Sequence, residues 1–182
     1  MMYDPSLVSQ NSQDWHHLNC YACGPANKLS LHADFLFDEA TGEVRFTYKT
    51  FAEHEGAPDC VHGGVLATLL DESQGVLCFH LGHFVMTDQL SLKYHKASPL
   101  QEKLTIRAWL SSVRKRRMYT KGTIHSQSGE LLVSSKAKWY VFPEKAIARK
   151  FQLSTLRVEH LCKVMEENRK RGKAIRRRLK EA

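Results

Sequence analysis

The chain has 182 residues, of which 42% are hydrophobic, and a formal net charge of +8 at pH 7. This length and composition fit one soluble globular domain with a proper core, and exclude a membrane-spanning helix because no apolar run approaches about 18 residues. The charge does not indicate an anionic partner for the whole chain: residues 1–142 hold 14 Lys and Arg against 14 Asp and Glu, whereas residues 143–182 hold 13 against 5.

The first residues argue against export. Residues 1–13 lack the basic start and the apolar centre of a secretory signal, so we expect a cytoplasmic protein. Its five cysteines are then expected to be reduced thiols rather than a disulfide framework. Residues 1–17 are polar and unpatterned, which predicts an N-terminal arm.

A Cys-x-x-Cys pair follows this arm. Cys20 and Cys23 come shortly after His16 and His17, and such residues suit a tetrahedral zinc site. No second ligand pair follows at the spacing of a zinc ribbon, which favours a structural turn instead. A redox role needs a strand-to-helix context that the sequence lacks.

Two strands are predicted before residue 50. Apolar and polar residues alternate over residues 31–37 and again over residues 44–48, as half-buried strands require. The residues between them, Asp-Glu-Ala-Thr-Gly, form a turn. Residues 51–60 are expected to be a loop that leads to His62 and is placed to act as a substrate gate.

The most regular pattern begins at His62-Gly-Gly and ends at His80. Apolar residues recur at three- and four-residue intervals and predict one buried helix face, made of Val65, Leu66, Leu69, Leu70, Val76 and Leu77. The opposite face lacks the Lys and Arg of a solvated helix and holds Ala67, Thr68, Asp71, Gln74, Gly75 and Cys78. We therefore expect another helix to pack closely against that face, with Asp71 in the seam and Glu72 at its flank.

The start of this helix predicts an oxyanion site. Its first amides have no intrahelical acceptors and lie at the positive end of the helix dipole, and glycines let a ligand approach them. Asp71 lies about two and a half turns further on, roughly a dozen ångströms away. Two antiparallel copies would bring the amides of one beside the carboxylate of the other. We therefore predict an active site between subunits.

Four more strands are predicted after the helix, which Gly82 ends. They cover residues 84–95, 104–110, 119–125 and 131–142, with turns at residues 114–117 and 127–129. Two strands, one long helix and four strands predict an α+β fold, in which a curved antiparallel sheet of about six strands buries the helix.

Residues 143–182 form a basic C-terminal extension. Its helical spacing involves Leu153, Leu156, Leu161, Val164 and Met165, with Ser154 or Thr155 as the N-cap. From Arg169 onward the chain is strongly basic. Three interpretations stay open: a solvated helix end that frays, contact with an anionic membrane surface or nucleic acid, and packing against a partner subunit.

The helix sequence also resembles a known family. The stretch from His62 to Glu72, His-Gly-Gly-Val-Leu-Ala-Thr-Leu-Leu-Asp-Glu, is similar to the signature of PaaI-type hotdog-fold acyl-CoA thioesterases, within the 4-hydroxybenzoyl-CoA thioesterase-like superfamily. Residues 20–27, Cys-Tyr-Ala-Cys-Gly-Pro-Ala-Asn, resemble the N-terminal motif of that branch, and residues 85–99 resemble its strand after the helix. The resemblance covers roughly residues 18–142, the expected hotdog domain, and it accounts for the cysteine pair without a metal.

The resemblance implies a role for each matching residue. Asp71 would be the catalytic carboxylate, as nucleophile or as general base for water. The amide of Gly63 would bind the thioester oxygen, His62 would orient or polarise the substrate, and Thr87 would help to position the water. We expect neither a cofactor nor a metal in the reaction, because a carboxylate and helix-end amides suffice.

Coenzyme A carries phosphates, so a neutral domain needs a local cluster of positive charge to bind it. The densest cluster consists of Arg114, Lys115, Arg116 and Arg117. With Gly64 and Glu72, its arginines complete the expected substrate-binding residues. A hairpin tip kept soluble by charge explains the same cluster equally well.

The sequence thus predicts an acyl-CoA thioesterase that forms a homodimer or a dimer of dimers. The alternative is a non-catalytic acyl-CoA-binding or regulatory module whose basic tail contacts a membrane or nucleic acid. Hydratase chemistry on the same fold is disfavoured, because it uses a different motif from His62-Gly-Gly. The sequence does not predict the length or aromatic character of the acyl group.

Overall fold

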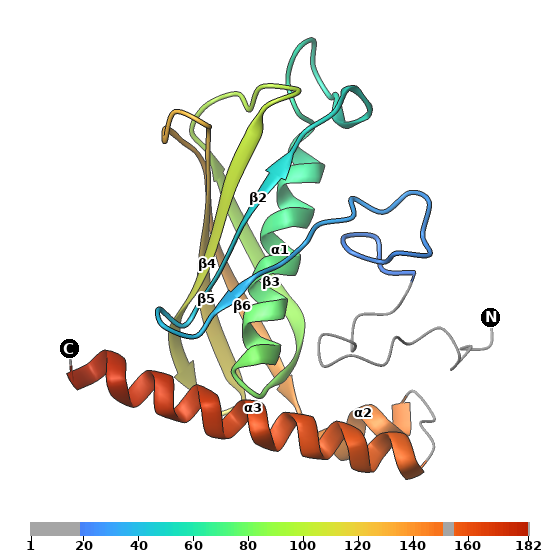
Figure 1. Ribbon diagram of the computed structural model, residues 1–182, viewed down its shortest axis with the longest axis vertical. Helices are drawn as coiled ribbons and strands as arrows, with labels where there is room; N and C mark the ends of the chain where they lie inside the picture. The colour runs from blue at the N-terminus through green and yellow to red at the C-terminus, as the bar shows by residue number, and fades with distance from the viewer. Residues whose placement is uncertain (1–18, 151–154, 182) are drawn as a thin grey trace.

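One long helix lies against an antiparallel sheet in the computed structural model, which describes residues 19–150 and 155–181 (Figure 1). The helix, α1, spans Gly63–His80. Within the described residues the sheet has six strands in the order β1-β2-β4-β5-β6-β3. Their bounds are β1 (Phe37–Asp38), β2 (Glu43–Lys49), β3 (Phe84–Tyr94), β4 (Lys103–Arg114), β5 (Arg117–His125) and β6 (Leu131–Phe142). The predicted α+β hotdog architecture is confirmed, whereas the predicted arm at residues 1–17 lies outside the described residues.

The hairpins after α1 follow the predicted turns. β4 and β5 are joined by a two-residue turn, in which Lys115 has a φ of 54°, and Arg114 pairs with Arg117 across it. A positive φ at a turn residue suits the right-handed twist of a hairpin. Between β5 and β6, Gly129 supplies a φ of 87°. β3 pairs with β6 alone and therefore forms one edge of the sheet.

The strand predicted over residues 31–37 is wrong for most of its length. Only Phe37–Asp38 pairs with β2. Further upstream, the backbone N–H groups of Leu31 and Ala33 donate to carbonyl groups within residues 19–30, at 2.9 Å each. Both side chains are buried. The chain packs against the Cys-x-x-Cys loop here, and this packing buries every second side chain. The alternation of apolar and polar residues therefore arises without a sheet.

The sheet-facing side of α1 differs from the predicted apolar face. Its buried residues are Leu66, Leu69, Leu70, Ser73, Gln74, Val76, Leu77, Cys78 and Phe79. Gln74 and Cys78, which were expected on the face opposite the apolar one, are fully buried. Val65, expected on the buried face, is only half-buried.

Hydrogen bonds explain how a glutamine is buried there. The Gln74 amide nitrogen donates to the Leu70 carbonyl at 2.8 Å and to the Ser135 hydroxyl at 2.9 Å. Its oxygen accepts from the Thr120 hydroxyl at 2.7 Å, which in turn accepts from the Trp139 indole at 2.7 Å. Because every polar atom of the buried amide has a partner, its desolvation is offset. This network sets the rotation of α1 against β5 and β6.

Two further helices cross the end of the domain at which α1 finishes (Figure 1). They are α2 (Glu144–Lys150) and α3 (Thr155–Glu181). Leu161 and Met165 of α3 are fully buried, and the Asn168 amide donates to the Phe79 carbonyl of α1 at 3.1 Å. A Cβ atom on Gly172 would lie 2.8 Å from the Leu81 carbonyl oxygen, so glycine permits this close approach.

The basic extension therefore docks on its own domain, which none of the three interpretations predicted. Arg171 pairs with Glu39 at 2.8 Å, and Arg178 donates to the Ala40 carbonyl at 3.0 Å. These contacts hold α3 against the β1–β2 turn. A frayed helix end would not make such contacts. Leu156, expected on the apolar stripe, is 79% exposed. The N-cap candidate Ser154 lies outside the described residues, and within them no helix is long and apolar enough to span a membrane.

Candidate active site

Asp71 and Thr87 meet between α1 and β3. Thr87 donates a hydrogen bond from its hydroxyl to Asp71 Oδ1 at 2.9 Å. Thr87 lies at a bulge in β3, where the register with β6 shifts between Thr87 and Gln89. Bulges re-aim side chains beside functional sites. With its proton directed to the carboxylate, the Thr87 oxygen keeps lone pairs that can accept a hydrogen bond from water.

The surroundings of Asp71 disfavour its charged form. Burial raises the pKa of its carboxyl above the ordinary value, and the neighbouring Glu72 carboxylate raises it further. The hydrogen bond from Thr87 lowers the same pKa and opposes both effects. A carboxylate in this state is a better proton acceptor than a solvated one.

A cavity of about 350 Å³ adjoins this pair. We call it the α1–β3 cavity; its lining residues are Asp71, Glu72, Gly75, Phe79, His83, Phe84, Val85, Met86, Thr87 and Trp139. The lining is largely apolar, with the two carboxylates, His83 and Thr87 as polar groups. Sequence reasoning missed the aromatic residues of this lining, because they come from the end of α1, from β3 and from β6, and no local pattern links them.

His62 caps the start of α1. Its ring atom Nδ1 accepts a hydrogen bond from the Gly64 N–H at 2.9 Å. A neutral imidazole that accepts at Nδ1 carries its proton on Nε2, which makes Nε2–H a donor. The Gly64 amide is therefore already engaged, whereas Gly63, the first residue of α1, has no intrahelical acceptor for its N–H. The oxyanion role predicted for Gly63 fits this arrangement better than a similar role for Gly64.

The loop of residues 51–60 holds His62 in place. The His62 N–H donates to the His54 carbonyl at 2.7 Å. A Cβ atom on Gly56 would lie 2.7 Å from His62 Cα, so only glycine allows this packing. On the other side, the Tyr94 hydroxyl donates to the Gly63 carbonyl at 2.9 Å. The loop lies beside the start of α1, as expected (Figure 1); its role as a gate stays a prediction.

A single chain does not bring these two halves together. Gly63 and Asp71 are eight residues apart on α1, which corresponds to about 12 Å along the helix at about 1.5 Å per residue. The structure thus joins Asp71 with Thr87 and Glu72, and joins His62 with Gly63 and Gly64, at separate places.

The predicted basic cluster divides into engaged and open side chains. Arg117 stacks over the Tyr140 ring, 4.4 Å from its centroid, and lies 3.4 Å from an Asp88 oxygen. Arg114, Lys115 and Arg116 are exposed. Arg117 therefore has a structural partner, and the other three form the open part of the cluster.

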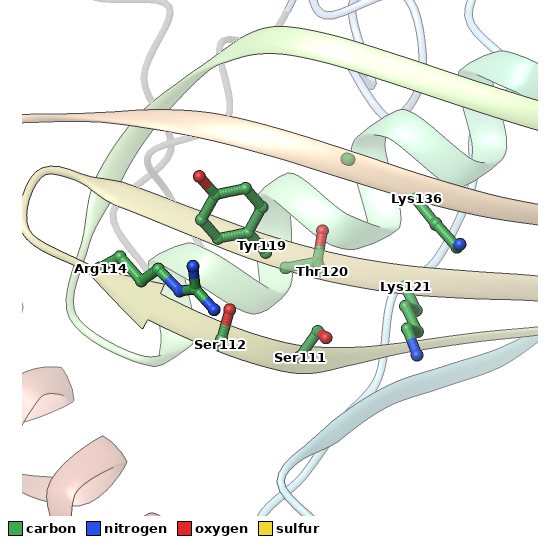
Figure 2. Close-up of a pocket in the computed structure, with 8 residues that line it drawn as sticks. Ser111, Ser112, Arg114, Tyr119, Thr120, Lys121 and Lys136 are labelled. Carbon is green, nitrogen blue, oxygen red and sulfur yellow. The ribbon is translucent and has the colours of Figure 1, made fainter.

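Arg114 also lines a second cavity of about 320 Å³. Figure 2 shows it over β4, β5 and β6, with Arg114 beside Tyr119 and Ser112 at one end and Lys121 beside Lys136 at the other. Thr120 points to the buried helix side, so its neighbours on β5 point to the opposite face of the sheet. Three cations thus gather around a hollow on the outer face, which the sequence did not predict because they come from three strands.

Comparisons with known proteins agree with this fold. Residues 59–133 match the model of the Thioesterase superfamily. The acyl-coenzyme A thioesterase THEM4 of Rattus norvegicus is 33% identical over 104 residues, which are 57% of this chain and 45% of that protein. The chain therefore spans less than half the length of this curated relative.

Two solved structures extend the comparison. A crystal structure of a thioesterase superfamily protein is 36% identical with a TM-score of 0.65, over 69% of this chain and 61% of that one. A hypothetical thioesterase from Streptococcus pneumoniae TIGR4, solved with coenzyme A, is 26% identical with a TM-score of 0.56, over 59% of this chain and 86% of that one. Together with the long helix, the six strands of the described residues and the His62-Gly-Gly start, these matches show a hotdog fold and a similarity to the thioesterase superfamily.

Proposed function

We propose that the protein is an acyl-CoA thioesterase, which hydrolyses a thioester to a free acid and coenzyme A at the interface of a homodimer. The superfamily match, the name of the THEM4 relative and the coenzyme A bound to the Streptococcus pneumoniae structure support this proposal. The observation that carries it is the hydrogen bond between Thr87 and Asp71 beside a largely apolar cavity.

In this mechanism, Asp71 and Thr87 act on one water molecule. Thr87 accepts a hydrogen bond from the water, and the Asp71 carboxylate takes its proton as the water attacks the thioester carbonyl. Attack by Asp71 itself, with an anhydride intermediate, is the other course that the same geometry allows. The thiolate of coenzyme A leaves without a general acid, because thiolates are good leaving groups.

The oxyanion is stabilised by the second copy. The Gly63 N–H of that copy, at the positive end of its α1, donates to the developing oxygen anion, and His62 beside it orients the carbonyl. One such donor is often worth about 2.7 to 4 kcal/mol in the transition state. A dimer is required because Gly63 and Asp71 lie too far apart on one helix.

The acyl group and the phosphates of coenzyme A bind at separate places. The acyl group enters the α1–β3 cavity, where Phe79, Phe84 and Trp139 exclude water. The phosphates of coenzyme A bind to the exposed Arg114 and Arg116. Arg117 instead stabilises the strand through its contacts with Asp88 and Tyr140. Glu72 forms part of the cavity wall.

Thiol release from short, long and aromatic acyl-CoAs, measured with the full chain, tests this function. We expect turnover with at least one class, and a strong loss of turnover in Thr87→Val but not in Thr87→Ser, which keeps the hydroxyl. Tight binding of acyl-CoA without any turnover would refute the proposed hydrolysis and favour a non-catalytic acyl-CoA-binding protein.

A further inference from the structure

Two cysteines and one glutamate gather where the Cys-x-x-Cys loop meets α1. Cys20 Sγ lies 3.8 Å from Glu72 Oε1, and Cys23 Sγ lies 3.9 Å from the same oxygen. One ligand atom from each of the three residues lies within 4.8 Å of the other two. Among residues 19–150 and 155–181, this is the one group of three or more such side chains close enough to share an ion.

These distances match a metal-centred arrangement. Zinc binds thiolate sulfur at about 2.3 Å and carboxylate oxygen at about 2.0 to 2.2 Å, so tetrahedral geometry separates sulfur from oxygen by about 3.6 Å. The two observed separations exceed this value by only a few tenths of an ångström. Small rotations of the side chains would therefore complete the coordination, with no change in the backbone.

The backbone of the loop presents both sulfurs to the helix. The Gly24 N–H donates to the Cys20 carbonyl at 2.9 Å and closes the turn between the cysteines. Ala22, in the middle of that turn, is buried, and the loop is bonded to Leu31 and Ala33. All three ligand residues are half-buried, so water reaches them only in part. Such a preformed turn lowers the entropic cost of binding an ion.

We propose that Cys20, Cys23 and Glu72 bind a zinc ion, which fastens the Cys-x-x-Cys loop to α1 at the residue next to Asp71. Two thiolates and a carboxylate select a borderline-soft divalent ion such as zinc. The thiol protons pass to solvent on binding. Water or a further side chain takes the fourth position. The sequence favoured a structural turn because the third ligand of the proposed site, Glu72, lies some fifty residues further along the chain than the cysteines.

This site does not depend on the proposed hydrolysis. Glu72 lines the α1–β3 cavity, so the ion would stabilise one wall of that cavity whatever reaction occurs there. Metal binding is therefore measured directly and not through turnover. Failure of the zinc proposal would leave the thioesterase proposal standing, and the reverse also holds.

Cobalt binding to the reduced, metal-free full chain tests the site. We expect one Co²⁺ per chain, with the near-ultraviolet band of thiolate-to-cobalt charge transfer and the intense visible bands of tetrahedral cobalt, and displacement by one Zn²⁺. Cys20→Ser and Cys23→Ser should each weaken binding by more than about 100-fold, since losing only a hydrogen-bond partner of a ligand often costs about 10- to 100-fold. Glu72→Gln, which keeps the shape of the side chain, should also weaken it by at least about tenfold.

Cys60→Ser and Cys162→Ser are the matched controls, because both thiols lie outside the cluster. They should bind cobalt like the unmodified chain. Circular dichroism of each variant shows whether it is folded, and the stoichiometry of the unmodified chain decides the question even if a cysteine variant does not fold. No tetrahedral cobalt spectrum, full affinity in Glu72→Gln, or a Cys20–Cys23 disulfide with no metal uptake after reduction would overturn the proposal.

Discussion

Asp71 is held in surroundings that stabilise its neutral form. Withdrawing a carboxylate from water costs free energy unless hydrogen bonds or cations compensate it; Asp71 is half-buried, and the described contacts supply one hydrogen bond, from Thr87. The adjacent Glu72 adds repulsion and no compensation. A residue that lowers stability in this way is typical of a site under functional constraint.

Asp71→Asn should therefore separate activity from stability. The amide oxygen can still accept the hydrogen bond from Thr87, and the neutral side chain removes the cost of burying a charge. We expect turnover to fall by about 10²-fold or more, the range for a lost general base. The thermal unfolding midpoint near neutral pH should stay equal or rise. Turnover equal to that of the unmodified chain would remove Asp71 from the mechanism.

His62 combines a structural and a chemical property. As N-cap it satisfies the Gly64 amide through Nδ1. His62→Ala should lower the free energy of unfolding by about 1 kcal/mol, the usual effect of a lost cap. His62→Asn should restore most of that stability, because asparagine is a good N-cap, but should not restore turnover if the imidazole orients the substrate.

Urea unfolding and thiol release, measured on the same preparations, separate these effects. If His62→Asn recovers both stability and turnover, then His62 acts only as a cap.

At the scale of elements, the contact between the end of α1 and α3 predicts a dependence on pH. His83 follows α1, and burial lowers its pKa, as do the nearby Arg176 and Arg169, whereas Glu144 raises it. A base with a lowered pKa contributes stability above its unfolded pKa of about 6.5, and that contribution is lost as the pH falls toward the folded value.

Acidification should therefore destabilise the chain through His83. Between about pH 7.5 and about pH 5, the free energy of unfolding should fall more steeply for the unmodified chain than for His83→Gln, which cannot take up the proton. Chemical denaturation at both pH values measures the difference. Equal slopes for the two proteins would show that His83 does not carry the effect.

The β4–β5 hairpin predicts a dependence on salt. Arg114 and Arg116 are exposed, so replacing both with Gln should raise the KM for acyl-CoA several-fold at low salt and much less at high salt, because exposed charges are screened. Stability should not change. Arg117→Gln is the contrasting variant: it should lower stability through the lost contacts with Tyr140 and Asp88. An unchanged KM at low salt would remove this cluster from substrate binding.

Elements with a regular local period were predictable from sequence. α1 and the four strands after it repeat every three to four or every two residues, and the structure has them where the pattern placed them. The strand predicted over residues 31–37 was mostly wrong, because burial against a loop gives the same two-residue period as a strand. The burial of Gln74 was not predicted, because it depends on hydrogen bonds with Thr120 and Ser135, which are remote in sequence. The family resemblance named Asp71 and Thr87 as site residues, whereas their hydrogen bond, the cavity lining and the approach of Glu72 to the cysteines arise only from the tertiary fold.

Over the whole molecule, charge and packing are distributed differently from what composition suggests. The excess positive charge lies in residues 143–182, yet α3 uses part of it internally, since Arg171 and Arg178 bind the β1–β2 turn. The helix thereby covers the end of α1. Meanwhile Asp71 and Gly75 on α1 are only half-buried, and residues 86–94 of the edge strand β3 are mostly exposed. These surfaces are where we propose that the second copy binds.

Mixed dimers test whether the active site is shared between two subunits. Asp71→Asn removes the carboxylate, and Gly63→Pro removes the amide donor at a position where proline suits a helix, since His62 has the extended ψ of 131° that a residue before proline prefers. Gly63→Ala, which keeps the N–H, is the control for the added bulk near the Tyr94 hydroxyl.

Each variant alone should be nearly inactive. If they are unfolded and refolded together in equal amounts, half of the dimers should contain one of each, and each mixed dimer should have one intact site, in which the unmodified Asp71 faces the unmodified Gly63 of the other copy. We expect the mixture to recover about one quarter of the thiol-release activity of the unmodified chain, because half of the dimers carry one intact site of two. No recovery on mixing, with mixed dimers shown to form, would contradict a site shared between subunits.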